Sequence, residues 1–292
     1  MSFKVFVPSH ISCFFSVYNS NDFLKSGSCG AGILLNKGVV TKIKKSSNNE
    51  ISIKTNGKKD ENDSISEKTA EYIKDKFQIN EGIAIKQDIE VPIGSGFGTS
   101  ASSAIGVAIA INNLFNLDIE PINLYQIAHV MEIKLGTGLG DVIAESSKGI
   151  VIRKKPGAPG FGKIINMVCD DLFVITKTFG SLDTKKIIQN PQIAKKINEL
   201  GIESTKEFLK NRNINNLLKI SFEFAKKSSL LSNEVLNSIH ELNKYTLGSS
   251  MAMLGNTVFA LSKTPEEDLE NIGDQNGFLI NKIDNQGVIT KF

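Results

Sequence analysis

The feature of this 292-residue chain that most restricts its fold is a glycine-rich stretch between two segments of different hydrophobic period. Residues 92–103 read PIGSGFGTSASS. Before them, residues 83–91 alternate apolar and polar side chains, which predicts a half-buried strand. After them, residues 101–115 are small and apolar with no turn former, which predicts a buried helix. The sequence therefore predicts a strand, a glycine-rich loop and a helix, in that order.

This loop has the chemistry of a phosphate-binding site. Gly94, Gly96 and Gly98 lack a Cβ atom, so the backbone can adopt positive φ angles and approach an anion closely. The unpaired N–H groups of the first helical turn point toward such an anion, with the positive end of the helix dipole behind them. Hydroxyl groups that could donate further hydrogen bonds or bind a metal follow at Thr99, Ser100, Ser102 and Ser103. The alternative is a tight turn with a serine N-cap, but three alternate glycines favour phosphate binding.

A second glycine-rich stretch, residues 157–163, matches the P-loop spacing G-x-x-x-x-G-K. Ile164 stands where a magnesium-binding Ser or Thr should be, and residues 165–168 predict a strand rather than a helix. We therefore reject a P-loop here. The basic residues just before it, 153–155, are more typical of a solvated turn than of an anion site.

Composition restricts the partners of this chain. It has 34 Lys and Arg against 31 Asp and Glu, and only Arg153 and Arg212 are arginines. A nucleic-acid surface usually clusters basic residues and favours arginine, so no nucleic-acid partner is expected. The three cysteines are odd in number and lack metal-site spacing, which fits a reducing compartment. No apolar run approaches the ~20 residues of a membrane span, and no cleavable leader is apparent, so we expect a soluble cytoplasmic protein.

Hydrophobic periodicity predicts further elements on both sides of a boundary near residue 160. In the first half we expect strands at 3–7 (ending at Pro8), 30–40 and 149–153, a hairpin around 51–54, and helices capped by Ser64 and beginning at Pro121. In the second half we expect a strand at 172–178, several amphipathic helices across 181–246, a small-residue loop at 249–261 leading into a strand, a helix at 265–272 and two short strands.

Four residues could support chemistry at bound phosphates. Ser100 at the helix start could bind Mg²⁺, which prefers hard oxygen ligands, and so could Glu132, although an isolated Glu is often a surface acid. Asp141 follows a glycine-rich turn, where it is either a helix N-cap or a base that accepts a hydroxyl proton. His10 follows Pro8-Ser9 at the predicted end of the first strand, a place where an active-site residue can lie.

These features together resemble the GHMP kinases, the superfamily of galactokinase, homoserine kinase and mevalonate kinase. Residues 92–103 resemble its P-x-x-x-G-L-G-S-S-A signature, and Pro8-Ser9-His10 stands where the family often has P-G-K. The Glu132 and Asp141 pair and residues 249–261 resemble its later motifs. The resemblance implies an α+β GHMP kinase fold. Its N-terminal half (residues 1–160) would be like ribosomal protein S5 domain 2, and its C-terminal half (residues 161–292) would be ferredoxin-like.

Within this superfamily the likeness is to the archaeal pantoate kinases. It is carried by residues 8–15, 24–32, 136–142, 155–160 and 250–256. It implies a homodimer that uses ATP and Mg²⁺ to phosphorylate the primary alcohol of pantoate, giving 4-phosphopantoate for coenzyme A synthesis. A kinase for another small alcohol, such as homoserine or mevalonate, remains an alternative, as does a non-catalytic ligand sensor with the same fold.

The resemblance also implies site residues. Those for the ATP phosphates are Gly94, Ser95, Gly96, Gly98, Thr99 and Ser100. Ser100 and Glu132 would bind magnesium, Asp141 would be the catalytic base, and the second catalytic position, His10, replaces a lysine near the reacting phosphate. The acceptor contacts would be Lys25, Ser28 and Ser250. Cys29 departs from an arginine expected in pantoate kinases, and Lys25 is the candidate to replace that arginine.

Overall fold

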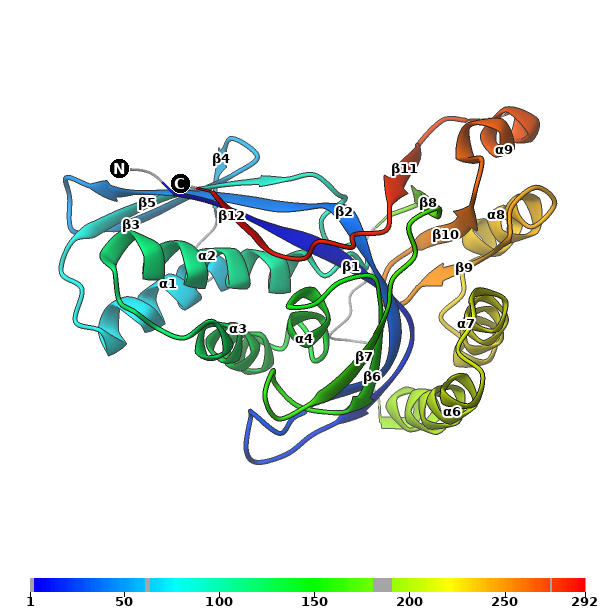
Figure 1. Cartoon of the computed structure of the whole chain (residues 1–292), viewed down its shortest axis with the longest axis horizontal. Helices are drawn as coiled ribbons and strands as arrows, with labels where there is room; N and C mark the ends of the chain where they lie inside the picture. The colour runs from blue at the N-terminus through cyan, green and yellow to red at the C-terminus, as the bar shows by residue number, and fades with distance from the viewer. Residues whose placement is uncertain (1–2, 61–63, 181–190, 274, 292) are drawn as a thin grey trace.

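Two long antiparallel strands lie side by side and curve along their length (Figure 1). β1 (Phe3–Tyr18) pairs with β2 (Gly27–Ser46) along nearly its whole length in the computed structural model, which describes residues 3–60, 64–180, 191–273 and 275–291. The prediction that the first strand ends at Pro8 was wrong. A proline removes a single ladder hydrogen bond, and a register shift between Pro8 and Ser9 accommodates it as a bulge. His10 therefore lies within a strand.

The first sheet has the order β12-β1-β2-β5-β3-β4, while β6 pairs with β2 and β7 pairs with β6. Its other strands are β3 (Ile51–Thr55), β4 (Lys58–Lys59), β5 (Gly82–Ile89), β6 (Ile150–Lys155), β7 (Lys163–Met167) and β12 (Ile289–Lys291). The predicted hairpin is confirmed, with Asn56 and Gly57 at its turn in left-handed conformations. The strand predicted after the rejected P-loop is β7.

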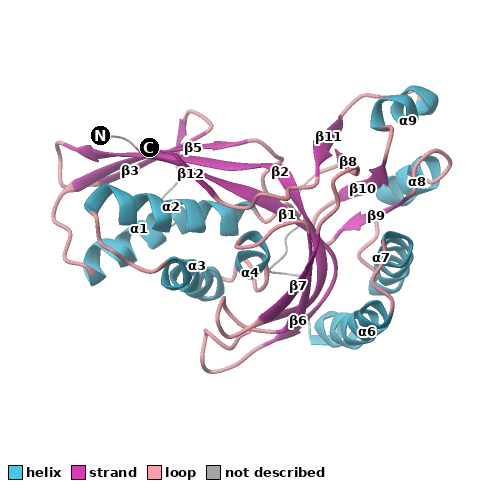
Figure 2. Ribbon diagram, viewed as in Figure 1, coloured by secondary structure: helices cyan, strands magenta, loops and turns pink. Residues whose placement is uncertain are grey.

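Helices α1 (Ile65–Lys76), α2 (Thr99–Phe115) and α3 (Pro121–Leu135) cover one face of this sheet (Figures 1 and 2). The predicted cap of α1 is confirmed, because the Ser64 hydroxyl accepts a hydrogen bond of 3.2 Å from the Glu67 backbone N–H. α2 is buried along nearly its whole length, as predicted. Its small side chains let it pack closely on the sheet residues Val5, Val7 and Ile43.

The second sheet has the order β11-β8-β10-β9, with every neighbouring pair antiparallel. Its strands are β8 (Phe173–Thr178), β9 (Gly248–Ala252), β10 (Thr257–Ser262) and β11 (Phe278–Lys282). The helices that connect them are α6 (Pro191–Lys210), α7 (Ile214–Ser228), α8 (Asn233–Leu242) and α9 (Pro265–Ile272). This order is the ferredoxin-like arrangement expected from the resemblance. The several helices predicted across 181–246 are confirmed from residue 191 onward, and residues 181–190 lie outside the described residues.

The loop predicted at 249–261 was wrong in its first part. Residues 248–252 form β9, and Ser250 pairs with Phe259 across to β10. Small residues conceal this strand from a hydrophobic pattern, because only the packed sheet shows that Ser249 and Ser250 are buried. The turn itself is confined to residues 253–256.

One apolar core extends across both halves. Phe14 and Phe15 of β1 contact Phe208 of α6 and Phe224 of α7, with ring centroids 5.9 to 6.4 Å apart. The C-terminal strand β12 returns to pair with β1, and β7 still belongs to the first sheet. The division at residue 160 stays a prediction. In the part of the chain that the structure describes, no helix is both long enough and apolar enough to span a bilayer.

Candidate active site

The glycine-rich loop has the backbone conformation that an anion cradle needs. Gly94, Gly96 and Gly98 all have positive φ, at 70°, 84° and 67°. Gly98 is the N-cap of α2 and no side chain caps this helix end, so the alternative of a serine N-cap is wrong. The N–H groups of the first turn of α2 therefore keep their hydrogen-bonding capacity for a ligand.

The loop is held from both sides by other segments. On one side, the His10 backbone N–H donates to the Phe97 carbonyl at 3.0 Å. On the other, Thr257 Oγ1 donates to the Ser95 carbonyl at 2.9 Å, and a Cβ atom at Gly255 would overlap that carbonyl. Because β1 and the β9–β10 turn both fix its backbone, the loop is preorganised rather than free to move.

A cavity of about 380 Å³ opens between this loop and the turn that precedes Asp141. Its wall includes Gly94, Ser95, Gly96, Gly98, Thr99 and Ser100, all of which were predicted to bind phosphates. The same wall includes Ser28, Asp141 and Arg153. One concave site thus combines the glycine-rich loop, a carboxylate and a guanidinium group.

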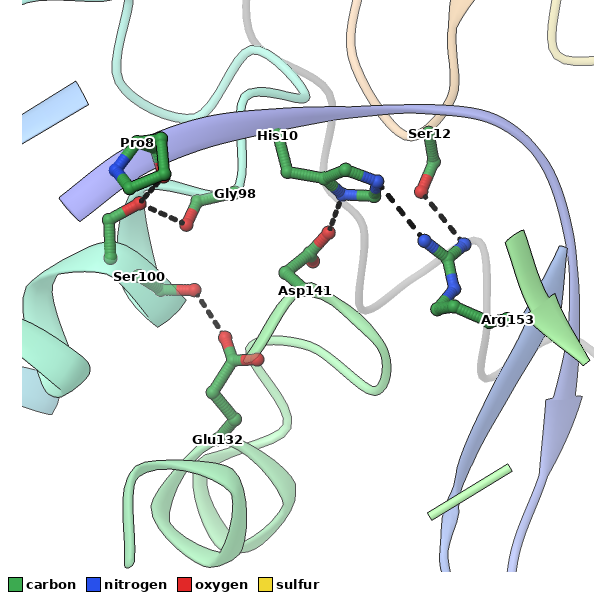
Figure 3. A network of polar contacts seen from close by, with 9 residues as sticks. Pro8, His10, Ser12, Gly98, Ser100, Glu132, Asp141 and Arg153 are labelled. Carbon is green, nitrogen blue, oxygen red and sulfur yellow. Dashed lines mark hydrogen bonds and ion pairs between the residues drawn. The ribbon is translucent and has the colours of Figure 1, made fainter. Parts of the chain in front are cut away.

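Ser100 and Glu132 meet at the edge of this site (Figure 3). The Ser100 hydroxyl donates to Glu132 Oε1 at 2.6 Å, while Glu132 Oε2 is buried without a hydrogen-bond partner among the described residues. Glu132 is only 1% exposed, so its alternative reading as a surface acid is wrong. Burial, followed by the negative charge of Asp141, raises the pKa of Glu132 to about 8.

Asp141 is the first residue of the short helix α4 (Asp141–Glu145), whose N-cap is Gly140, so the alternative that Asp141 is the N-cap is wrong. Its side chain is 26% exposed, and Oδ1 lies 2.7 Å from His10 Nδ1. Burial acts to raise the pKa of Asp141, but the hydrogen bond from His10 and the charge of Arg153 outweigh it, and the pKa is lowered. Asp141 is therefore ionised at neutral pH.

Arg153 is the site residue that sequence reasoning missed. The expected solvated turn was wrong: residues 153–155 belong to β6, where Lys154 and Lys155 are exposed but Arg153 is 1% exposed. Its Nη1 lies 3.1 Å from His10 Nε2, its Nη2 donates to Ser12 Oγ at 3.2 Å, and its Nε has no partner among the described residues. Local sequence gives no signal for it, because the chain's other arginine, Arg212, is exposed, and the burial of Arg153 comes from the pairing of β6 with β2 and β7.

The three residues predicted to bind the acceptor lie in different places. Ser28 lines the cavity, where a Cβ atom at Gly140 would overlap its hydroxyl. The Lys25 side chain is 65% exposed and pairs with Asp22 at 3.3 Å, outside the cavity wall. Ser250 is buried within β9, also away from the wall. The structure thus brings Ser28 to the site, but not Lys25 or Ser250.

Comparison with known proteins agrees with this geometry. The family model described as "GHMP kinases N terminal domain" matches residues 64–149. The chain is 42% identical to the pantoate kinase of Methanocaldococcus jannaschii over 268 residues, which cover 91% of this chain and 94% of that protein. It is 34% identical to the pantoate kinase of Thermococcus kodakarensis, with 92% of this chain and 90% of that protein covered.

Solved structures show the same fold. A protein titled "Phosphotransferase related to CoA biosynthesis pathway" superimposes with a TM-score of 0.90 and 29% identity, covering 100% of this chain and 99% of the other. The homoserine kinase of Cytophaga hutchinsonii, at 19% identity and a TM-score of 0.72, covers 99% of this chain and 97% of its own, and shows the likeness of fold alone. The predicted α+β GHMP kinase fold is confirmed. The chain belongs to the GHMP kinase superfamily and, within it, to the pantoate kinase family.

Proposed function

We propose that this protein transfers the terminal phosphate of ATP to the primary alcohol of pantoate, giving 4-phosphopantoate for coenzyme A synthesis. The observation that carries the proposal is the meeting of three groups on one cavity: the cradle at 94–100, the ionised Asp141 and the buried cation Arg153. The 42% identity to a pantoate kinase supports the choice of acceptor.

The cradle is the site we assign to the ATP phosphates. Positive φ at Gly94, Gly96 and Gly98 is the backbone conformation in which N–H groups can converge on an anion, and the dipole of α2 adds partial positive charge at this end of the helix. Thr99 and Ser100 add hydroxyl donors on the same wall. These groups would hold the triphosphate in line with the acceptor and stabilise the charge that develops on the transferred group.

Ser100 and Glu132 fit a bound Mg²⁺. Glu132 Oε2 is a buried carboxylate oxygen without a partner among the described residues, and the Ser100 hydroxyl lies beside the same carboxylate. A buried carboxyl left in this state is costly unless a cation or donor completes it. When bound, Mg²⁺ would neutralise part of the phosphate charge.

Asp141 is the group we assign to the acceptor proton. As the hydroxyl oxygen of pantoate forms its bond to the γ-phosphorus, the bond from that phosphorus to the ADP oxygen breaks and the hydroxyl proton passes to the Asp141 carboxylate. The lowered pKa keeps Asp141 in the acceptor form at neutral pH. Its partly exposed side chain faces the cavity that would hold the hydroxyl.

Arg153 is the group we assign to the carboxylate of pantoate. It provides a guanidinium on the cavity wall, with an Nε–H that has no partner among the described residues. A buried cation with a free donor favours an anionic acceptor over a neutral alcohol. Because Lys25 is exposed and paired with Asp22, Arg153 is better placed to replace the arginine expected at Cys29.

The test is ADP release with magnesium-ATP and pantoate, with homoserine and mevalonate run in parallel. We expect turnover with pantoate, and a loss in kcat of roughly 10²–10⁴-fold in Asp141→Asn with an unchanged melting temperature. Turnover with another alcohol would keep the kinase and reject the pathway. No turnover with any acceptor, despite ATP binding, would favour the ligand sensor.

The homodimer and the cytoplasmic location belong to the same proposal. A solution mass of twice 31.8 kDa would support the dimer, whereas a mass of 31.8 kDa would reject it.

A further inference from the structure

His10 lies between the carboxylate and the guanidinium of the site (Figure 3). Its ring is fully buried, with Nδ1 2.7 Å from Asp141 Oδ1 and Nε2 3.1 Å from Arg153 Nη1. Both ring nitrogens are therefore engaged. The three side chains come from β1, α4 and β6, and they form one continuous polar chain that ends at the cavity.

The chemistry of these contacts determines the position of the histidine proton. A guanidinium group has only N–H donors, so Arg153 Nη1 must donate to His10 Nε2 and Nε2 must carry a lone pair. The ring proton is then on Nδ1, which donates to Asp141 Oδ1. Burial, together with the charge of Arg153, lowers the pKa of His10 despite the hydrogen bond to Asp141, so the ring is neutral.

The surrounding backbone leaves room for this arrangement. A Cβ atom at Gly32, on the neighbouring strand, would overlap the His10 ring at Nε2, and one at Gly140 would lie 3.1 Å from Arg153 Nε. The His10 backbone N–H also donates to Phe97 of the glycine-rich loop at 3.0 Å. A side chain at position 32 would therefore displace the His10 ring, while the closest obstacle at position 140 is the Ser28 hydroxyl.

We propose that His10 is a positioning residue: as a neutral imidazole it orients Asp141 toward the acceptor hydroxyl, and Arg153 selects its Nδ1–H tautomer. The inference rests on the proposed function in that Asp141 is taken as the base. A lysine at position 10 would place a permanent positive charge directly beside Asp141. In this protein that charge is on Arg153, which contacts the opposite side of the His10 ring. The group assigned to the acceptor anion and the base are thus connected through one ring.

Other ionisable groups surround this chain. Glu132 of α3 and Glu145 of α4 act electrostatically with Asp141, and the thiols of Cys13 on β1 and Cys29 on β2 act with Arg153. Burial raises the pKa of Glu145 well above its usual range and raises that of both thiols. Near neutral pH, Asp141 and Arg153 are therefore the charges that act on His10.

The first test needs no kinase activity. Nitrogen-15 NMR of the histidine rings of the resting protein reports which ring nitrogen carries the proton, and only three histidines contribute. His10→Gln assigns the His10 signals. We expect a protonated Nδ1 and an unprotonated Nε2 across neutral pH, and a mixture of tautomers or a charged ring in Arg153→Met. An Nε2–H tautomer or an imidazolium in the unmodified protein would overturn the proposal.

The second test compares two amides at position 10. In His10→Asn the side-chain N–H takes the place of Nδ1–H and keeps the bond to Asp141, whereas in His10→Gln the amide reaches Arg153 instead. We expect His10→Asn to stay within about tenfold of the unmodified kcat, and His10→Gln to lose about 100-fold. The acid limb of the pH–rate profile should also move to higher pH in His10→Gln, because Asp141 loses the donor that lowers its pKa.

Equal losses in the two variants would overturn the positioning role, since a merely structural ring would not distinguish them. An unmodified protein without activity toward any acceptor would instead reject the proposed function, while the ring nitrogens would still report the tautomer.

Discussion

The glycine-rich loop and the proposed base site (His10, Asp141 and Arg153) share one cavity but are built in different ways. The loop is one continuous segment, residues 94–100, and its chemistry lies in backbone N–H groups and positive φ angles. The base site joins side chains from separate elements: Asp141 is 131 residues from His10, and Arg153 is 143 residues from it. A backbone site can be specified by adjacent residues, whereas a side-chain site depends on the fold that brings its members together.

The largest loss of catalytic efficiency should come from removing the cation of the base site. Arg153→Met should lower kcat/KM for pantoate by about 10²-fold, because a charge-assisted hydrogen bond is lost and the His10 tautomer is released. The loss should be smaller for the amide of pantoate, which has no carboxylate. Steady-state kinetics with both acceptors checks this.

Arg153→Lys is the matched control, since it keeps the charge but not the planar guanidinium. Its kcat/KM for pantoate should lie between those of the unmodified protein and Arg153→Met. Equal losses with pantoate and its amide would limit Arg153 to its contact with His10.

A smaller effect should follow from altering the loop backbone. Gly98 has φ 67°, and a Cβ atom there would overlap Glu145 Oε1, so Gly98→Ala should raise KM for ATP about tenfold. Gly57→Ala is the control, because Gly57 also has positive φ, 81°, but has nothing within 4 Å of its Cβ position. Gly57→Ala should cost about 1 kcal/mol of stability and leave KM unchanged. An unaltered KM in Gly98→Ala would mean that the loop does not hold the phosphates.

The smallest effect is on stability and concerns Glu132. Its pKa is about 8 in the folded protein against an ordinary 4.5, so between these values the unfolded carboxyl is ionised and the folded one is not. The protein should therefore lose stability as the pH rises through this window in the absence of metal. Glu132→Gln, which cannot ionise, should unfold at higher urea than the unmodified protein at about pH 8.5 and at similar urea at about pH 5.

Urea titrations in EDTA at the two pH values measure this difference, and Glu81→Gln serves as the exposed control. Hydrogen bonding to Lys45 lowers the pKa of Glu81, so its replacement should give no gain at high pH. An equal gain in both variants would contradict the assignment to Glu132.

Local sequence was sufficient to predict the elements whose geometry depends on residues that are neighbours in the chain. The strand before the loop, the loop and α2 were predicted from alternation, glycine spacing and a small apolar run, since each depends on residues that are neighbours in the chain. The Ser64 cap and the turn at Asn56-Gly57 were predicted for the same reason. The family likeness then supplied the expected roles of Ser100, Glu132 and Asp141.

Local sequence failed where a residue's surroundings come from elsewhere. A proline at position 8 predicted the end of a strand, but pairing with β2 carries β1 past it. Three consecutive basic residues predicted a solvated turn, but Arg153 is on the buried side of β6. Lys25 was the candidate to replace the arginine expected at Cys29, but its side chain is exposed to solvent.

The sequence by itself determined that a glycine-rich loop leads into a buried helix, because glycine spacing and hydrophobic period act over a few residues. Only the tertiary structure decided that His10, Asp141 and Arg153 form one hydrogen-bonded chain at the cavity beside that loop. Their contacts depend on the pairing of β1, β2 and β6, which places side chains more than a hundred positions apart within hydrogen-bonding distance.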